Sequence, residues 1–156
     1  MDELAALLED TVDGGASVGF LPPLGVEEAR GYWGKVCDAI DSGGRILLAA
    51  RQAGRLIGSV QLDPAGMPNG SHRAEVMKLM VAREARRQGI GRALMRAIEE
   101  ESRRIGRSLL VLDTRVGDAA ERLYQDIGYR RAGVIPRYAR GGSGELQDTV
   151  IFYKFV

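Results

Sequence analysis

A short run of arginines and glycines near the middle of the chain has the composition of an anion-binding loop. Arg86-Arg87-Gln88-Gly89-Ile90-Gly91 reads R-x-x-G-x-G and stands between an apolar stretch and an amphipathic one. Glycine lets a backbone come close to a ligand, and arginine is a planar donor that stays charged. The first amides of a helix have no partner inside it and lie at the positive end of its dipole. A helix that begins in this run would therefore offer a site for phosphate.

Two common nucleotide-binding loops do not fit this pattern. The run has no Lys-Ser/Thr pair, which the P-loop needs for the terminal phosphates and the magnesium ion. It also lacks the third glycine and the downstream acidic residue of the dinucleotide fingerprint. The remaining alternative to a phosphate site is an exposed basic helix start with turn glycines.

The elements on either side of this loop are predicted from the spacing of apolar residues. Val76–Val81 is an apolar run interrupted only by Lys78, as expected for a largely buried strand. From Ile90 the apolar residues recur at helical spacing, with Leu94 and Ile98 on the same face. The loop is therefore expected to connect a strand to a helix.

The rest of the chain shows further helices and strands in alternation. Helices are expected over 2–12, 26–42 and 119–127, and strands over 45–51, 56–62, 108–112, 129–135 and 149–156, with a hairpin turn near Ala53-Gly54 and a Gly-rich loop over 139–148. This order predicts an α/β or α+β sheet with helices on both faces. With 156 residues and no repeats or long linker, residues 1–156 are expected to form a single domain.

The bulk composition argues against several classes of protein. The net charge is +1, so the overall field favours neither nucleic acid nor a membrane surface, and aromatic residues for base stacking amount to only 6%. The charge is uneven, however, because acidic residues dominate the N-terminal segment and arginines dominate 83–107. There is neither an apolar run long enough to span a bilayer nor a signal-peptide pattern. The single cysteine, Cys37, is expected to pack in the core, and the protein is expected to be cytoplasmic.

The loop and its flanks resemble those of a known enzyme family. Arg86–Gly91, with Glu75 eleven residues upstream of Arg86, is similar to the pyrophosphate loop [Q/R]-x-x-G-x-[G/A] of the GNAT family of N-acetyltransferases. Further segments resemble the members that acetylate a β-lactam amine and confer toxin resistance. These segments are Gly14–Phe20, Pro68–Gly70, Arg73–Val76, Lys78–Val81, Leu112–Thr114 and Tyr124. The similarity extends from Gly14 to the C-terminus.

This resemblance implies a fold, a reaction and a cofactor. The fold is expected to be the GNAT fold, a mixed and mostly antiparallel sheet flanked by helices. The reaction is expected to be direct acetyl transfer from acetyl-CoA to the amine of a small molecule in a ternary complex, with no metal and no acyl-cysteine. The implied CoA-binding residues are Leu79, Met80, Val81, Arg86, Arg87, Gln88, Gly89, Ile90, Gly91, Arg92, Gly117 and Ala120.

The acceptor amine stays open at this point. An antibiotic or toxin is what the resemblance suggests, and a protein N-terminus, an amino acid or a polyamine is the alternative. A non-catalytic acyl-CoA-binding regulator is the alternative to an enzyme.

Two carboxylates are candidates for the base that acetyl transfer requires. An ammonium cannot attack a thioester, so a base must first take its proton. Glu75 is the first candidate, since burial at the start of an apolar strand would raise its pKa. Asp113 is the second, because the strand it ends lies beside the Glu75 strand in the family. The alternatives are a salt bridge from Glu75 to Arg73 or Lys78 and a turn or cap role for Asp113.

The resemblance also supplies an acid and an oxyanion donor. Tyr124 matches the position of the family tyrosine, whose hydroxyl points at the CoA sulphur, and its alternative role is core packing. The backbone amide of Leu79 or Met80 is expected to face the developing oxyanion, where the family strands splay apart.

The chain departs from the family pattern in two places that bear on its assembly and cofactor site. Family members usually begin with a strand before the first helix, whereas this chain starts directly in that helix. The sheet is therefore expected to lack the first family strand, and an uncovered edge would favour a homodimer. Gly117 stands where many members have an asparagine seven residues before the tyrosine.

Overall fold

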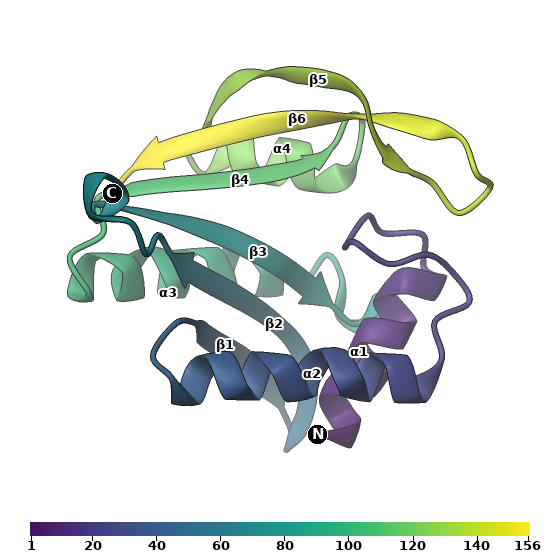
Figure 1. Cartoon of the computed structure of the whole chain (residues 1–156). Helices are drawn as coiled ribbons and strands as arrows, with labels where there is room; N and C mark the ends of the chain where they lie inside the picture. The colour runs from purple at the N-terminus through teal and green to yellow at the C-terminus, as the bar shows by residue number, and fades with distance from the viewer.

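The protein is built on one six-stranded sheet with helices on both of its faces (Figure 1). The computed structural model describes all of residues 1–156. Its helices are α1 (Asp2–Asp13), α2 (Val26–Asp41), α3 (Ile90–Arg104) and α4 (Ala119–Asp126). Its strands are β1 (Ile46–Gln52), β2 (Arg55–Pro64), β3 (Arg73–Val81), β4 (Leu109–Arg115), β5 (Arg130–Arg140) and β6 (Leu146–Phe155), with short 3-10 turns η1 (Pro68–Gly70) and η2 (Arg83–Ala85).

The sheet is mixed and mostly antiparallel, which confirms the predicted fold. Its strand order is β1-β2-β3-β4-β6-β5, and β3 and β4 are the one parallel pair of neighbours. No strand precedes α1, so β1 lies at the edge of the sheet as expected. None of the helices is both long and apolar enough to cross a membrane.

The sheet opens at its centre, between β3 and β4. Their pairing is confined to Arg73–Glu75 on β3, and beyond Glu75 the two strands diverge (Figure 1). Just past this point β3 contains a bulge, since the register with β2 shifts between Ser59↔Met80 and Gln61↔Met77. Lys78 lies in this bulge with a left-handed φ of 52°. Bulges bend a strand and redirect side chains, and here the bulge helps to separate β3 from β4.

Two apolar cores hold the layers together, one on each face of the sheet. On one face, α3 and α4 pack on the strands through residues such as Leu94, Ile98 and Tyr124. On the other face, α1 and α2 form a second core that includes Leu8 and Trp33. Fully burying one large apolar side chain stabilises a fold by roughly 1.5–3 kcal/mol, so these two faces fix the frame around the central opening.

The hairpin of β5 and β6 is longer than the sequence predicted. The predicted loop over 139–148 shrinks because backbone pairing continues to Arg140↔Leu146, after an irregularity between Ile135 and Ala139. These strand ends are exposed and polar, so they lack the alternation that marks a half-buried strand.

The prediction for β4 was also too short, and this correction bears on the site. The apolar run stops at Leu112, but the strand continues to Arg115. Asp113 therefore pairs with Ile151 inside the sheet, and the alternative of a turn or cap role is wrong.

Candidate active site

The three candidate catalytic side chains line one cavity. It has a volume of about 260 Å³ and lies where β3 and β4 diverge, with Glu75, Asp113 and Tyr124 all on its walls. The other walls come from the segment between α1 and α2 and from the β5–β6 hairpin. They include Ala16–Gly19, Tyr138, Ala139 and Thr149. Residues far apart in the sequence thus face a common space.

Glu75 keeps access to solvent, yet its surroundings disfavour the charged form. Partial burial raises the pKa of its carboxyl group above the ordinary value, and the negative charges of Asp113 and Asp63 raise it further. The charge of Lys78 acts in the opposite direction. The predicted alternative of a salt bridge is not found, because no ion pair joins Glu75 to Lys78 or Arg73.

Asp113 resembles Glu75 in its electrostatic environment. Burial raises the pKa of its carboxyl group, while the nearby positive charge of Lys78 lowers it in part. A carboxyl group with a raised pKa holds a proton more firmly than an ordinary one and is a better match for an amine. The cavity therefore carries two carboxyl groups suited to accepting a proton.

Tyr124 presents a protonated hydroxyl group to the same region. The residue is only 6% exposed, and the centre of its ring lies 5.9 Å from that of Tyr129 and 6.0 Å from that of Phe152. Burial raises the pKa of the hydroxyl group well above its ordinary value, and the charges of Asp113 and Asp118 add to this effect. At neutral pH the group is a donor, as a proton source for a leaving thiolate must be.

The start of α3 has the predicted geometry of a phosphate site. Its N-cap residue, Gly89, has a left-handed φ of 82°, and Arg87 before it also has a positive φ of 63°. No side chain caps the first turn, and no acidic residue lies in it. The free amides at this helix start therefore have no competing partner in the chain.

The two loop glycines meet different needs. Gly89 requires its left-handed backbone, while nothing lies within 4 Å of where its Cβ would stand. At Gly91, an added Cβ would lie 3.4 Å from Leu123 Cδ2 and 3.9 Å from Val81 Cγ2. Gly89 thus shapes the loop, whereas a Cβ at position 91 would make only ordinary contacts with α4 and β3.

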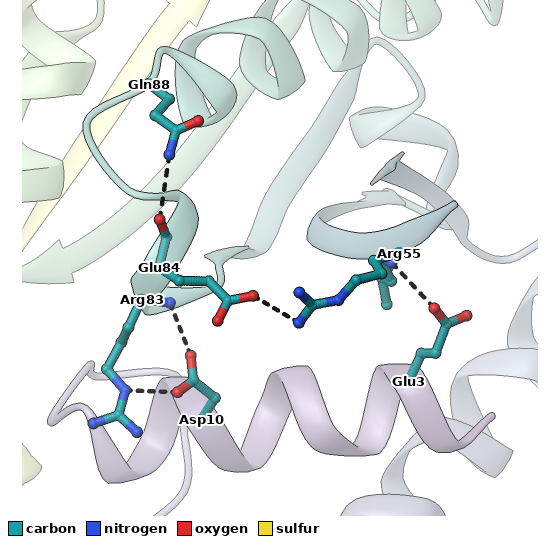
Figure 2. A network of polar contacts seen from close by, with 7 residues as sticks. Glu3, Asp10, Arg55, Arg83, Glu84 and Gln88 are labelled. Carbon is teal, nitrogen blue, oxygen red and sulfur yellow. Dashed lines mark hydrogen bonds and ion pairs between the residues drawn. The ribbon is translucent and has the colours of Figure 1, made fainter. Parts of the chain in front are cut away.

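A network of polar contacts ties this loop to α1 and β2 (Figure 2). Asp10 accepts hydrogen bonds from the backbone N–H of Arg83, at 2.9 Å, and from its Nε, at 2.6 Å. Glu84 pairs with Arg55 at 2.7 Å, and Gln88 Nε2 donates to the backbone oxygen of Glu84 at 3.2 Å. One indirect signal of this network is present in the sequence, namely the opposite charge bias of the N-terminal segment and the arginine-rich region.

The arginines predicted to bind CoA differ in how they are held. Arg86 donates from Nε to the backbone oxygen of Val81 at 3.2 Å, and Arg92 lies 3.6 Å from Asp126. Arg87 is exposed and takes part in no ion pair within the chain. Arg87 is therefore the arginine most available to an incoming phosphate.

The other residues predicted to bind CoA are spread over the opening and its surroundings. Leu79 and Ala120 line the cavity together with Tyr124. Met80 is only 1% exposed, and its side chain packs in the core on the α1 and α2 face. Gly117 lies between β4 and α4 with a φ of 85°, and its N–H donates to Glu121.

Comparison with known proteins identifies the class of enzyme. The sequence profile described as "Acetyltransferase (GNAT) family" matches residues 16–129, and the chain belongs to this family. It is 33% identical over 117 residues to an uncharacterized N-acetyltransferase in the hisH-hisA intergenic region of Azospirillum brasilense, a match that covers 74% of this chain and 68% of that protein. The chain is therefore an N-acetyltransferase of the GNAT type, as its sequence predicted.

Solved structures confirm the fold. A ribosomal-protein-alanine N-acetyltransferase from Brucella melitensis superposes with a TM-score of 0.81 at 24% identity, over 98% of this chain and 92% of that one. A putative acetyltransferase from Salmonella typhimurium, solved with its cofactor acetyl-CoA, gives a TM-score of 0.80 at 17% identity, over 97% and 85% of the two chains.

Proposed function

We propose that this enzyme transfers the acetyl group of acetyl-CoA to the amine of a small molecule, directly and within a ternary complex. The observation that carries this proposal is the cavity at the opening of the sheet. Glu75, Asp113 and Tyr124 line it, and two further residues expected to bind CoA, Leu79 and Ala120, line it with them.

The residues present fit acetyl-CoA. The uncapped start of α3 supplies free amides for a pyrophosphate, and exposed Arg87 adds a positive charge beside them. The divergence of β3 and β4 leaves backbone groups of β3 without a strand partner on that side, and these groups are the proposed partners of the pantetheine arm. The amide of Leu79 or Met80 is the proposed donor to the developing oxyanion.

The side chains of the cavity divide the proton transfers between them. Glu75 or Asp113 takes a proton from the acceptor ammonium, and the raised pKa of each brings it closer to that of the amine. Tyr124 donates its proton, or a hydrogen bond, to the leaving sulphur. Cys37 on α2 does not line the cavity, which supports transfer without an acyl-cysteine.

The wall formed by Ala16–Gly19 bears on the acceptor. It belongs to the segment Gly14–Phe20, which resembles the tabtoxin resistance protein, an acetyltransferase of a β-lactam amine. A β-lactam amino acid toxin or related antibiotic is therefore the first acceptor to test. Polyamines, amino acids and protein N-termini are the alternative acceptors.

Association of two copies through the β1 edge of the sheet stays a prediction.

An acetyl-CoA turnover screen tests the proposal. The purified protein is incubated with acetyl-CoA and a panel of amines that includes β-lactam amino acids, and free CoA thiol is followed with time. We expect thiol release that depends on the amine and yields an acetylated product by mass spectrometry. Tight acetyl-CoA binding by calorimetry with no amine-dependent release would instead support a non-catalytic acyl-CoA-binding regulator.

A further inference from the structure

One charged side chain of the cavity has no role in the chemistry above. Lys78 lines the same cavity as Glu75 and Asp113, and the β3 bulge places it there with its left-handed backbone. In the sequence, Lys78 interrupts an apolar strand, is a candidate partner for Glu75 and belongs to the segment Lys78–Val81 that resembles the family. In the structure it forms no ion pair with either carboxylate.

The surroundings of Lys78 hold its ammonium group without neutralising it. Its Nζ lies 5.9 Å from the ring centre of Phe20 and 5.8 Å from that of Tyr32, and these rings meet edge to face at 5.2 Å. The Tyr32 ring is itself fixed, since its hydroxyl and the amide of Gln61 are hydrogen-bonded at 2.9 Å. Rings of this kind orient a cation through their negative faces but supply no counter-charge.

The ammonium group is also partly removed from water. Burial lowers the pKa of Lys78 below its ordinary value, although the charges of Asp113 and Glu75 oppose this. A charged group that has lost water and gained no hydrogen-bonded partner is destabilised. A ligand that brings an anion to Nζ would restore that partner.

We propose that Lys78 binds a carboxylate of the acceptor, so that the acceptor is an amine that also carries a carboxylate, as an amino acid does. This inference rests on the proposed function, because it assigns the second end of the acceptor in the same cavity. The amine of the acceptor lies at Glu75 and Asp113, and its carboxylate lies at Lys78.

The charges and the size of the cavity favour this class of acceptor over two others. Glu75 and Asp113 would repel a phosphate dianion more strongly than a single carboxylate, since the repulsion scales with charge. A polyamine would leave Lys78 without a partner and would add a second positive charge beside it. The volume of about 260 Å³ suits a small molecule.

Matched acceptors and matched variants test the inference together. Initial rates are measured at saturating acetyl-CoA for pairs of an α-amino acid and its carboxamide, such as lysine and lysinamide, with a β-lactam amino acid included. Wild type, Lys78→Met and Lys78→Arg are compared, and Lys35→Met on the exposed face of α2 serves as the control. Thermal melting of each variant monitors folding.

We expect Lys78→Met to lower kcat/KM for the acids on the order of 10- to 100-fold more than for the carboxamides, as for the loss of a hydrogen bond between charged groups. Any change in the pKa of Glu75 and Asp113 acts on both acceptors alike. Lys78→Arg should retain part of the preference, and Lys35→Met all of it. The ratio of kcat/KM for an acid to kcat/KM for its carboxamide is compared between wild type and each variant, so that the different basicity of the two amines cancels.

Three results would overturn the inference. One is an equal effect of Lys78→Met on acids and carboxamides, and another is a wild-type enzyme that acetylates amines without a carboxylate as well as it does acids. The third is a failure to acetylate any acid of the panel. If other amines are still acetylated, the proposed function stands and only the carboxylate site is refuted; absence of transfer to any amine would refute both.

Discussion

The two halves of the proposed site, the loop at the start of α3 proposed to bind CoA and the cavity between β3 and β4 proposed to bind the acceptor, are built in different ways. The loop is a contiguous run, Arg86–Gly91, and its proposed function rests on backbone conformation and free amides. The cavity gathers side chains from several elements that the fold brings together. The proposed site for a cofactor common to a whole family can thus be predicted from a local sequence motif, whereas the proposed acceptor site forms only in the tertiary structure.

This difference has a consequence for mutations. Changes of backbone freedom in the loop should weaken acetyl-CoA binding and leave the chemical step intact. Changes of charge in the cavity should slow the chemical step and leave acetyl-CoA binding intact.

The largest effect is expected from removing both carboxylates. The double variant Glu75→Gln/Asp113→Asn should lower kcat by roughly 10²- to 10⁴-fold, the usual contribution of general base catalysis. Each single variant should lose less, because the carboxylates lie in the same cavity and can replace each other in part. Initial rates with one fixed amine measure this, with exposed Glu100→Gln as the control. An active double variant would leave water or the acceptor itself as the proton acceptor.

Replacing Tyr124 by phenylalanine should have the next largest effect. The ring stays in place, so the melting temperature should change little, while the proton for the leaving thiolate is lost. We expect kcat to fall about 10²-fold, at the lower end for acid catalysis, because a thiolate is already a tolerable leaving group. An unchanged kcat at unchanged stability would show that Tyr124 serves only as core packing.

The loop glycines should respond unequally. Gly89→Ala places a Cβ on a backbone with a φ of 82°, which costs an L-residue roughly 1–2 kcal/mol. The variant either loses that much stability or its loop relaxes to another backbone conformation. If the loop relaxes, the KM for acetyl-CoA should rise about 5- to 30-fold with kcat preserved. Gly91→Ala has only an ordinary contact of 3.4 Å to accommodate and should be milder. A larger effect at Gly91 would contradict the assignment of the cap.

Weakening the support of the loop should have a smaller effect of the same kind. Asp10→Asn removes the charge that holds Arg83, three residues before the loop begins at Arg86. We expect a rise of a few fold in the KM for acetyl-CoA and no change in kcat. Glu9→Gln, on the same helix but outside the network, is the matched control. A fall in kcat alone would mean that α1 acts on the cavity and not on the loop.

The smallest effect concerns stability and its dependence on pH. Because the pKa of Glu75 is raised in the folded protein, the unfolded chain loses this proton first as the pH rises past 4.5. Stability is therefore lost between that value and the raised pKa, and the loss persists above it. Glu75→Gln should melt at a higher temperature than wild type near neutral pH, with the difference vanishing in acid. A variant that is less stable at neutral pH would show that the charge stabilises the fold.

The same raised pKa values set the pH dependence of activity. As the pH rises, kcat/KM should increase through a midpoint above the ordinary range of a carboxyl group, as Glu75 and Asp113 lose their protons. Tyr124 should contribute no fall in rate near neutral pH, since its own pKa is raised. The measurement is kcat/KM against pH for wild type and for each single carboxylate variant.

The strands and helices, and the loop between β3 and α3, could be predicted from the sequence because each leaves a local signal. The change from the apolar run Val76–Val81 to helical spacing after Ile90 marks a strand and a helix, and the glycines mark the turn between them. The position of Asp113 inside β4 left no such signal, since a polar residue after an apolar run is also typical of a turn. The packing of Lys78 against Phe20 and Tyr32 depends on the β3 bulge and on residues far from Lys78 in the sequence, so no local pattern predicts it.

Calorimetric titration of the Glu75→Gln/Asp113→Asn variant with acetyl-CoA tests most directly whether the two halves of the site are separate. If the loop at α3 binds the cofactor and the carboxylates act only on the acceptor, the Kd should stay within about twofold of the wild-type value while kcat is lost. A twofold change corresponds to about 0.4 kcal/mol, well below the cost of losing a phosphate contact. A loss of affinity that parallels the loss of kcat would contradict the account, because the carboxylates would then belong to the cofactor site.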